Sequence, residues 1–233
     1  MAATPPELRA AVRALADPAR AANLRSFFKT GPGEYGEGDR FLGLTVPQVR
    51  GLLRRFHPVD FAALPAILRS PFHEERLLGL LLLVERYRKG TDADRDRAHR
   101  LYWKSLPHIN NWDLVDVTAE HVVGPHGAGR ARLLAWAGSK NLWCRRIAIV
   151  STFHAIRRNR FGDTLAVARR LLRDPEDLLH KATGWMLREV GKRDAAVLER
   201  FLRRHHRVMP RTMLRYAIER FPEAKRKRYL AAR

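Results

Sequence analysis

The segment "NNWDLVDVTAEHVVG", residues 110–124, places an indole and a carboxylate four positions apart. On a helix, side chains at positions i and i+4 lie on one face, so Trp112 and Asp116 could act on the same bound group. The pair also fits a plain alternative, a core tryptophan next to a solvated aspartate.

The composition favours a polyanionic partner. The chain has 45 Lys and Arg against 24 Asp and Glu, a formal charge of +21, and a pI of about 11.3. This excess exceeds what solubility requires, and we expect a nucleic acid rather than a membrane as the partner. Hydrophobic residues make up 45% of the 233 residues, which is enough for a sizeable core and excludes a disordered basic tail.

Several other classes of protein are disfavoured. The single Cys144 excludes an intramolecular disulfide and fits a reducing cytoplasm. The ten histidines show no HExxH or similar ligand spacing, so we expect neither a metal nor another cofactor. The N-terminus lacks the continuous apolar stretch of a signal peptide, and the apolar run at 77–87 is too short to span a bilayer. We therefore expect a cytoplasmic protein without membrane contact, in which 77–87 is a buried helix.

The hydrophobic pattern predicts an all-α fold. Apolar residues recur at helical spacing almost everywhere, and alternating β-branched runs between hairpin turns are missing. Five helical segments, each predicted as one helix, start roughly 31 to 37 residues apart, which is close to the length of one helix pair in an α-solenoid. They begin at 74, 111, 142, 178 and 211.

This spacing predicts an α-solenoid of HEAT-like helical pairs with a concave basic surface. A compact irregular helical bundle is the alternative. No long low-complexity linker interrupts the chain, so we expect a single domain over 1–233, and we expect a monomer.

Basic residues recur on the predicted helices that carry aromatic residues, as repeated phosphate contacts require. They are Arg145 and Arg146 after Trp143, Arg188 after Trp185, and Arg211 with Arg215 one helical turn further. Each of them, taken singly, also fits a solvated face or an intrahelical ion pair. As a set, together with the net charge, they favour nucleic-acid binding.

Five segments of the chain carry a resemblance to a known family. They are "FFKTGPGEYGEGDRFLGLTVPQVR" (27–50), "NNWDLVD" (110–116), "NLWCRRIAIV" (141–150), "KATGWMLREVGK" (181–192) and "RTMLRYAIER" (211–220). In this order they resemble the signature segments of the AlkD-like DNA alkylation repair glycosylases, a HEAT-repeat family. The similarity extends from about residue 20 to 220.

The resemblance implies that the chain excises purines alkylated at N3 or N7 from double-stranded DNA, by hydrolysis of the N-glycosidic bond. In the family, a Trp and an Asp one helical turn apart, an Arg on the next repeat and a Trp on the one after converge on the lesion. The matching residues here are Trp112, Asp116, Arg146 and Trp185. Arg145 is an alternative for Arg146, since the two are adjacent.

The implied chemistry suits these residue types. A purine alkylated at N3 or N7 is cationic and already a good leaving group, so no general acid is needed. Asp116 would stabilise the oxocarbenium-like sugar and orient the attacking water, with Arg146 keeping the carboxylate ionised. Trp112 and Trp185 would offer π faces to the cationic base, each contributing about 0.5–2 kcal/mol.

Two nearby residues are given other roles. We expect Asp113 to face elsewhere and to compensate the helix dipole after the Asn110/Asn111 cap. Lys181, four residues before Trp185, is the candidate for a lyase nucleophile, but a lone Lys more often contacts phosphate. We therefore expect a monofunctional glycosylase in which Lys181 binds DNA.

Two other functions compete with this hypothesis. A non-catalytic HEAT-repeat scaffold that grips bent or branched DNA would have no use for a carboxylate such as Asp116 facing a phosphate-lined groove. A helical protein that binds an acidic protein partner would explain the charge, but not the positions of the tryptophans.

Overall fold

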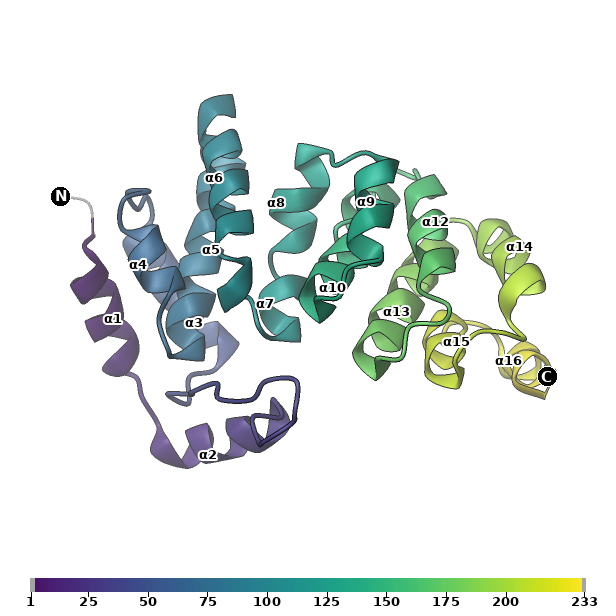
Figure 1. Ribbon diagram of the computed structural model, residues 1–233, viewed down its shortest axis with the longest axis horizontal. Coiled ribbons are helices and arrows are strands. Elements are labelled where there is room, and N and C mark those ends of the chain that lie inside the picture. Colours follow the sequence, from purple (N-terminus) through teal and green to yellow (C-terminus); the bar gives the residue numbers. More distant parts are fainter. Residues whose placement is uncertain (1–2, 232–233) are drawn as a thin grey trace. The chain divides into compact units, whose positions relative to one another are not determined.

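The computed structural model describes residues 3–231 and confirms the all-α fold class (Figure 1). Apart from one isolated bridge between Arg40 and Phe72, the described residues contain helices, turns and loops only. Several pairs of helices that are consecutive or next-but-one in the chain pack against one another, as expected for a helical-repeat protein. None of the helices within 3–231 is long and apolar enough to cross a membrane.

Residue contacts divide the chain into two compact units, Met1–Val122 and Val123–Arg233, which are described in turn. The helices of the first unit are α1 (Pro5–Arg13), α2 (Pro18–Phe27), α3 (Val46–Phe56), α4 (Leu64–Leu68), α5 (His73–Lys89), α6 (Asp92–Lys104) and α7 (Trp112–Asp116), with a 3₁₀ turn at Leu106–His108. Helix α8 (Ala119–His126) includes the boundary between the units.

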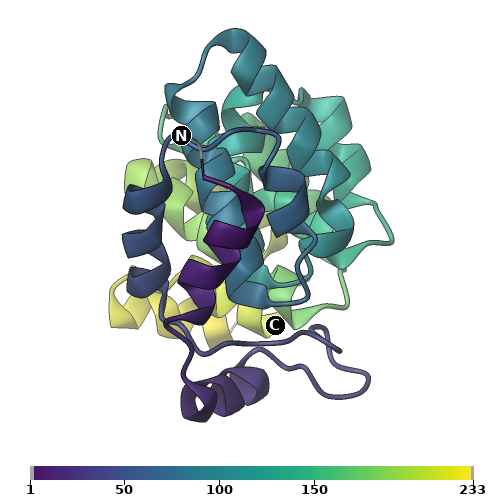
Figure 2. The same cartoon turned by 90° about the vertical axis from the view of Figure 1, so that its left-hand side faces the viewer.

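Helix α5 is the centre of the first unit. It packs against α3, α4 and α6, and its side chains from His73 to Val84 are buried. The apolar run 77–87 is therefore part of a buried helix, as predicted. Helix α2 and the loop after it lie at one end of this unit, crosswise to α1 and α3 (Figure 2).

The region from residue 111 onward differs from the single helix that the pattern predicts. It forms two helices, α7 and α8, because the helix breaks at Val117 and Thr118. The Thr118 hydroxyl donates to the carbonyl of Leu114 at 2.6 Å, a side-chain bond that competes with helix continuation. Trp112 and Asp116 are the first and last residues of α7, so their predicted helical relation holds.

The second unit is built around α13. Its helices are α9 (Arg130–Ala137), α10 (Leu142–Val150), α11 (Phe153–Ile156), α12 (Gly162–Arg170), α13 (Asp177–Arg193), α14 (Ala195–His205), α15 (Arg211–Ala217) and α16 (Glu223–Ala231). Helix α13 packs against α10, α12, α14 and α15. Gly184 lets α15 approach closely, since a Cβ there would lie 2.5 Å from the Met213 carbonyl oxygen.

Candidate active site

Helix α7 is fixed at its N-terminus by the predicted asparagine cap. The side chain of Asn111 accepts a hydrogen bond from the Trp112 backbone N–H at 2.9 Å, and Asn111 is fully buried. The loop before α3 passes close by, because a Cβ on Gly36 would lie 3.2 Å from Asn111 Nδ2 and 2.6 Å from the Phe28 carbonyl. The Gly-rich segment 31–39 is thus a connecting loop, and it packs next to α7.

Asp113 has a second role that the sequence did not reveal. It lies in the first turn of α7, where it suits the helix dipole as expected. Its carboxylate is also buried, with 8% of the residue exposed, and accepts a hydrogen bond from His73 Nε2 at 2.7 Å. Asp113 therefore anchors α7 to α5.

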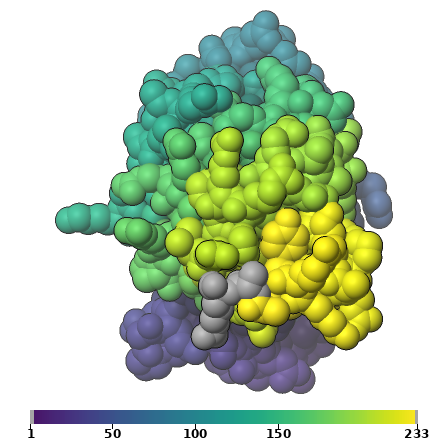
Figure 3. Space-filling model, turned by 90° about the vertical axis from the view of Figure 1, so that its right-hand side faces the viewer, coloured from purple at the N-terminus to yellow at the C-terminus, as the bar shows by residue number. Residues whose placement is uncertain are grey.

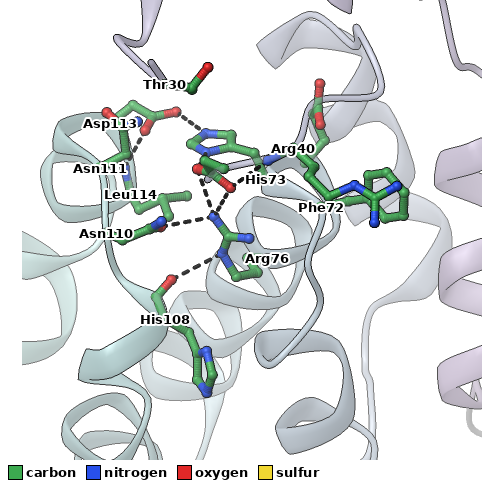
Figure 4. Close-up of polar contacts among 12 residues, drawn as sticks. Thr30, Arg40, Phe72, His73, Arg76, His108, Asn110, Asn111, Asp113 and Leu114 are labelled. Atoms are coloured by element: carbon green, nitrogen blue, oxygen red, sulfur yellow. Dashed lines mark hydrogen bonds and ion pairs between the residues drawn. The ribbon is translucent and has the colours of Figure 1, made fainter. Parts of the chain in front are cut away.

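His73 belongs to a buried network of charges (Figure 4). Its other ring nitrogen, Nδ1, is 3.0 Å from Asp39 Oδ2, and Arg76 Nη2 donates to both oxygens of Asp39 at 2.7 and 2.9 Å. Arg76 also donates to the Asn110 side chain at 2.9 Å and to the His108 carbonyl at 3.0 Å. The network joins the loop before α3, helix α5 and the segment leading into α7.

The network is held in its charged form. Burial alone would lower the pKa of His73, but the charges and hydrogen bonds of Asp113 and Asp39 outweigh it and raise the pKa to about 9. Burial would also raise the pKa of Asp39, yet the His73 hydrogen bond and the Arg76 charge hold it below its ordinary value. The positive charges of His73 and Arg76 thus balance the negative charges of the Asp39 and Asp113 carboxylates inside the first unit.

The segment "HEER", 73–76, is the part of this site that sequence analysis missed. All four residues are buried. Glu74 accepts hydrogen bonds from the backbone N–H groups of Leu42, Gly43 and Leu44, and Glu75 accepts from the Ser70 hydroxyl at 2.6 Å. The available signal was the position of four polar residues directly before the most apolar run, at the buried start of one helix.

Trp112 lies at the end of an aromatic stack. Its ring stacks on Phe28 at 5.4 Å, Phe28 stacks on Phe41 at 5.0 Å, and Phe41 stacks on His73 at 4.5 Å. Trp112 is half-buried, so it partly fits the core alternative and still leaves indole surface accessible. Phe27, 62% exposed, lies edge-on to Trp112 at 6.1 Å and adds an aromatic surface that sequence analysis missed.

The other two predicted catalytic residues belong to the second unit. Arg146, 5% exposed, donates from Nη1 to the Leu178 carbonyl at 2.7 Å, which joins α10 to α13. Trp185 is half-buried on α13 and packs edge-on against Phe153 at 5.7 Å. Arg145, the alternative to Arg146, donates a hydrogen bond from Nε to Asp174 Oδ2 at 2.6 Å.

Most of the predicted DNA-binding cations have partners within the protein. Arg145 pairs with Asp174, Lys181 with Asp177 at 2.8 Å, and Arg188 with Glu219, while Arg211 donates to the Leu230 carbonyl at 2.7 Å. Arg215 is exposed on α15. Their roles toward DNA stay predictions.

The part of the chain covered by the structure holds no group of three or more His, Cys, Asp or Glu side chains suited to a metal ion. Cys144 is a free, buried thiol. Burial raises the pKa of this thiol above its ordinary value.

The fold and the site define an all-helical repeat protein with an acid and an indole on one short, anchored helix. Comparison with known families shows which family this is, because a family described as DNA alkylation repair enzyme matches residues 8–221. The chain belongs to this family, and a role in the repair of alkylated DNA follows from that membership.

A solved structure described as a predicted DNA alkylation repair enzyme from Enterococcus faecalis shares the fold. Its sequence is 17% identical, the match covers 89% of this chain and 97% of that chain, and the TM-score is 0.70. No curated protein matches the chain in sequence.

Proposed function

We propose that this protein is a monofunctional DNA glycosylase that releases N3- or N7-alkylated purines from double-stranded DNA. The observation that carries the proposal is the placement of Trp112 and Asp116 on one short helix, α7, whose first turn is anchored by Asn111 and Asp113. An anchored helix holds the carboxylate and the indole in fixed positions, which electrostatic stabilisation of a developing charge requires.

The proposed reaction breaks the C1′–N bond, and the bonding electron pair leaves with the base. The base loses its positive charge as it departs, and positive charge builds on the sugar. Asp116 stabilises this sugar cation and orients the water that adds to C1′. The added water loses one proton to solvent, and the products are the neutral base and a sugar with a hydroxyl at C1′. Because water itself forms the new bond to C1′, the reaction needs neither a covalent enzyme intermediate nor a lysine nucleophile.

The indole of Trp112 supplies selectivity. A cationic alkylated purine gains attraction from a π face that a neutral purine lacks, by about 0.5–2 kcal/mol. Arg146 and Trp185 are assigned to the same reaction through the family resemblance. Trp185 would offer a second π face to a cationic base.

The test is the release of free alkylated purine from methylated duplex DNA by the parent and by Asp116→Asn. The substitution keeps the side-chain size and removes the charge, so excision should fall strongly while duplex affinity holds or rises. Asp92→Asn is the matched control, because Asp92 is an exposed acid of the same unit and should leave excision unchanged.

The same experiment decides between enzyme and scaffold. Parental excision by Asp116→Asn would remove Asp116 from the mechanism. A parent that binds duplex DNA but releases no purine would favour the non-catalytic scaffold instead.

A further inference from the structure

Net charge is distributed unevenly along the chain. Residues 123–233 contain 27 Lys and Arg against 9 Asp and Glu, whereas residues 1–122 contain 18 against 15. The second unit, Val123–Arg233, therefore carries nearly all of the excess positive charge.

Most acids of the second unit already have basic partners. The pairs are Asp163 with Arg130, Asp174 with Arg145, Asp177 with Lys181, Glu189 with Lys192, Glu199 with Lys225, Glu219 with Arg188, and Glu223 with Lys227. Arg169, Arg200 and Arg204 lie outside these pairs, and no carboxylate within 3–231 forms an ion pair with them. These three arginines are exposed on α12 and α14.

A groove of about 560 Å³ brings these arginines together. It lies between α9, α12 and α14, and Arg130, Arg169, Arg200 and Arg204 line it. Apolar side chains, including Phe161 and Phe201, form most of the remaining lining together with Gly162 and His205, and no Asp or Glu contributes to it. A second hollow shares Arg169 and adds Arg170, at the end of α12, and Arg173, which follows that helix.

We propose that this groove binds the phosphodiester backbone of DNA, at a segment other than the one that holds the lesion. Guanidinium groups match phosphate oxygens in geometry and charge, and several unpaired ones in a row suit a backbone with repeated phosphates. The proposal rests on family membership in DNA repair and does not require glycosylase activity.

The charges of the groove act on a histidine in its lining. Burial lowers the pKa of His205, and the positive charges of Arg169 and Arg204 lower it further. A phosphate bound between these arginines would offset their charge, so duplex DNA should raise the pKa of His205. The histidine is therefore a built-in probe of groove occupancy.

The space-filling view in Figure 3 shows the C-terminal part of the second unit, with α14, α15 and α16 in yellow-green to yellow. Arg200 and Arg204 are exposed and one turn apart on α14, so both can be removed without emptying a core position. Arg50 and Arg54 have the same spacing and exposure on α3 of the first unit, and they provide the matched control.

The experiment compares Arg200→Ala/Arg204→Ala with Arg50→Ala/Arg54→Ala. Affinity for an undamaged duplex is measured by fluorescence anisotropy over a range of salt concentrations. Loss of two phosphate contacts should reduce the slope of log affinity against log salt by about 1.8, at about 0.9 per phosphate. The control should keep the parental slope, and thermal melting checks that both variants are folded.

The second readout is the pKa of His205, followed by NMR with and without duplex. It should rise on DNA addition in the parent and not in Arg200→Ala/Arg204→Ala. Equal changes of slope in the two variants, or a His205 pKa that DNA leaves unchanged in the parent, would overturn the proposal. Weakened binding of polyglutamate with unchanged duplex binding would also overturn it, in favour of an acidic protein partner.

Discussion

The buried pair of His73 and Asp113 makes the stability of the protein depend on pH. The folded-state pKa of His73 is about 9, against 6.5 for the ordinary side chain. A raised pKa means that the folded state binds the proton more tightly, so this stabilisation is complete below pH 6.5 and is lost as pH rises to 9. At about 1.4 kcal/mol per pH unit, the loss amounts to about 3 kcal/mol.

The measurement is urea unfolding, followed by tryptophan fluorescence, at several pH values between 6 and 10. We expect the free energy of unfolding to fall across this range in the parent. Asp113→Asn removes one of the two carboxylates that raise the pKa of His73, so its curve should be flatter. Asp92→Asn, the exposed control, should keep the parental slope.

Two results would refute this reasoning. One is a free energy of unfolding that stays level or rises between pH 6.5 and 9. The other is an NMR titration in which His73 loses its proton near its ordinary pKa, because the network would then not hold the charged form.

Four further predictions follow from the described contacts. Trp112→Ala and Trp185→Ala should each slow excision of cationic lesions more than they weaken binding to undamaged duplex; equal losses in the two assays would make both residues structural. Asp113→Asn should lower the free energy of unfolding by about 1.5–3 kcal/mol, because it removes the charge of one of the two carboxylates that are hydrogen-bonded to buried His73; denaturant titration at pH 6 checks this. Gly184→Ala should lower the melting temperature, since its Cβ would meet the Met213 carbonyl, and an unchanged melting curve would contradict that packing. Duplex affinity of the parent should fall steeply with salt, and a nearly flat plot would exclude multiple phosphate contacts.

Helical periodicity was sufficient to predict the fold class and most of the helices that carry the candidate site. Helices α5, α13 and α15 begin within one residue of the starts that the pattern predicts at 74, 178 and 211. The break between α7 and α8 was not predictable in this way, because Val117 and Thr118 continue the helical pattern. It depends on a local hydrogen bond from the Thr118 hydroxyl, which periodicity does not register.

The support behind α7 could not be predicted because its parts are far apart in the sequence. Asp39, His73 and Asp113 meet only after the loop before α3 packs against α5 and α7. Single-sequence patterns assign each of them to a solvated or helix-terminal position. The sequence alone suggests only a helix-dipole role for Asp113, but its carboxylate is bonded to His73. Asp113 is therefore a poor control residue for Asp116.

The available cations of the second unit could not be predicted from the sequence either. Aromatic neighbours and spacing suggested Arg145 and Arg188 as phosphate contacts, but their carboxylate partners, Asp174 and Glu219, are about thirty residues away. No carboxylate within the described residues forms an ion pair with Arg200 or Arg204. These two arginines lie on α14, which sequence analysis did not single out as a DNA-binding helix. Ion pairing across helices decides which cations remain available, and it requires the three-dimensional structure.

The unequal division of charge between the units has a kinetic consequence. Long-range attraction toward a polyanion follows net charge, so residues 123–233 provide almost all of the force that steers the protein to DNA. The second unit should therefore make the first encounter, at a rate that falls with ionic strength. The nearly balanced first unit, with Trp112 and Asp116, would then search along the captured duplex through short-range contacts.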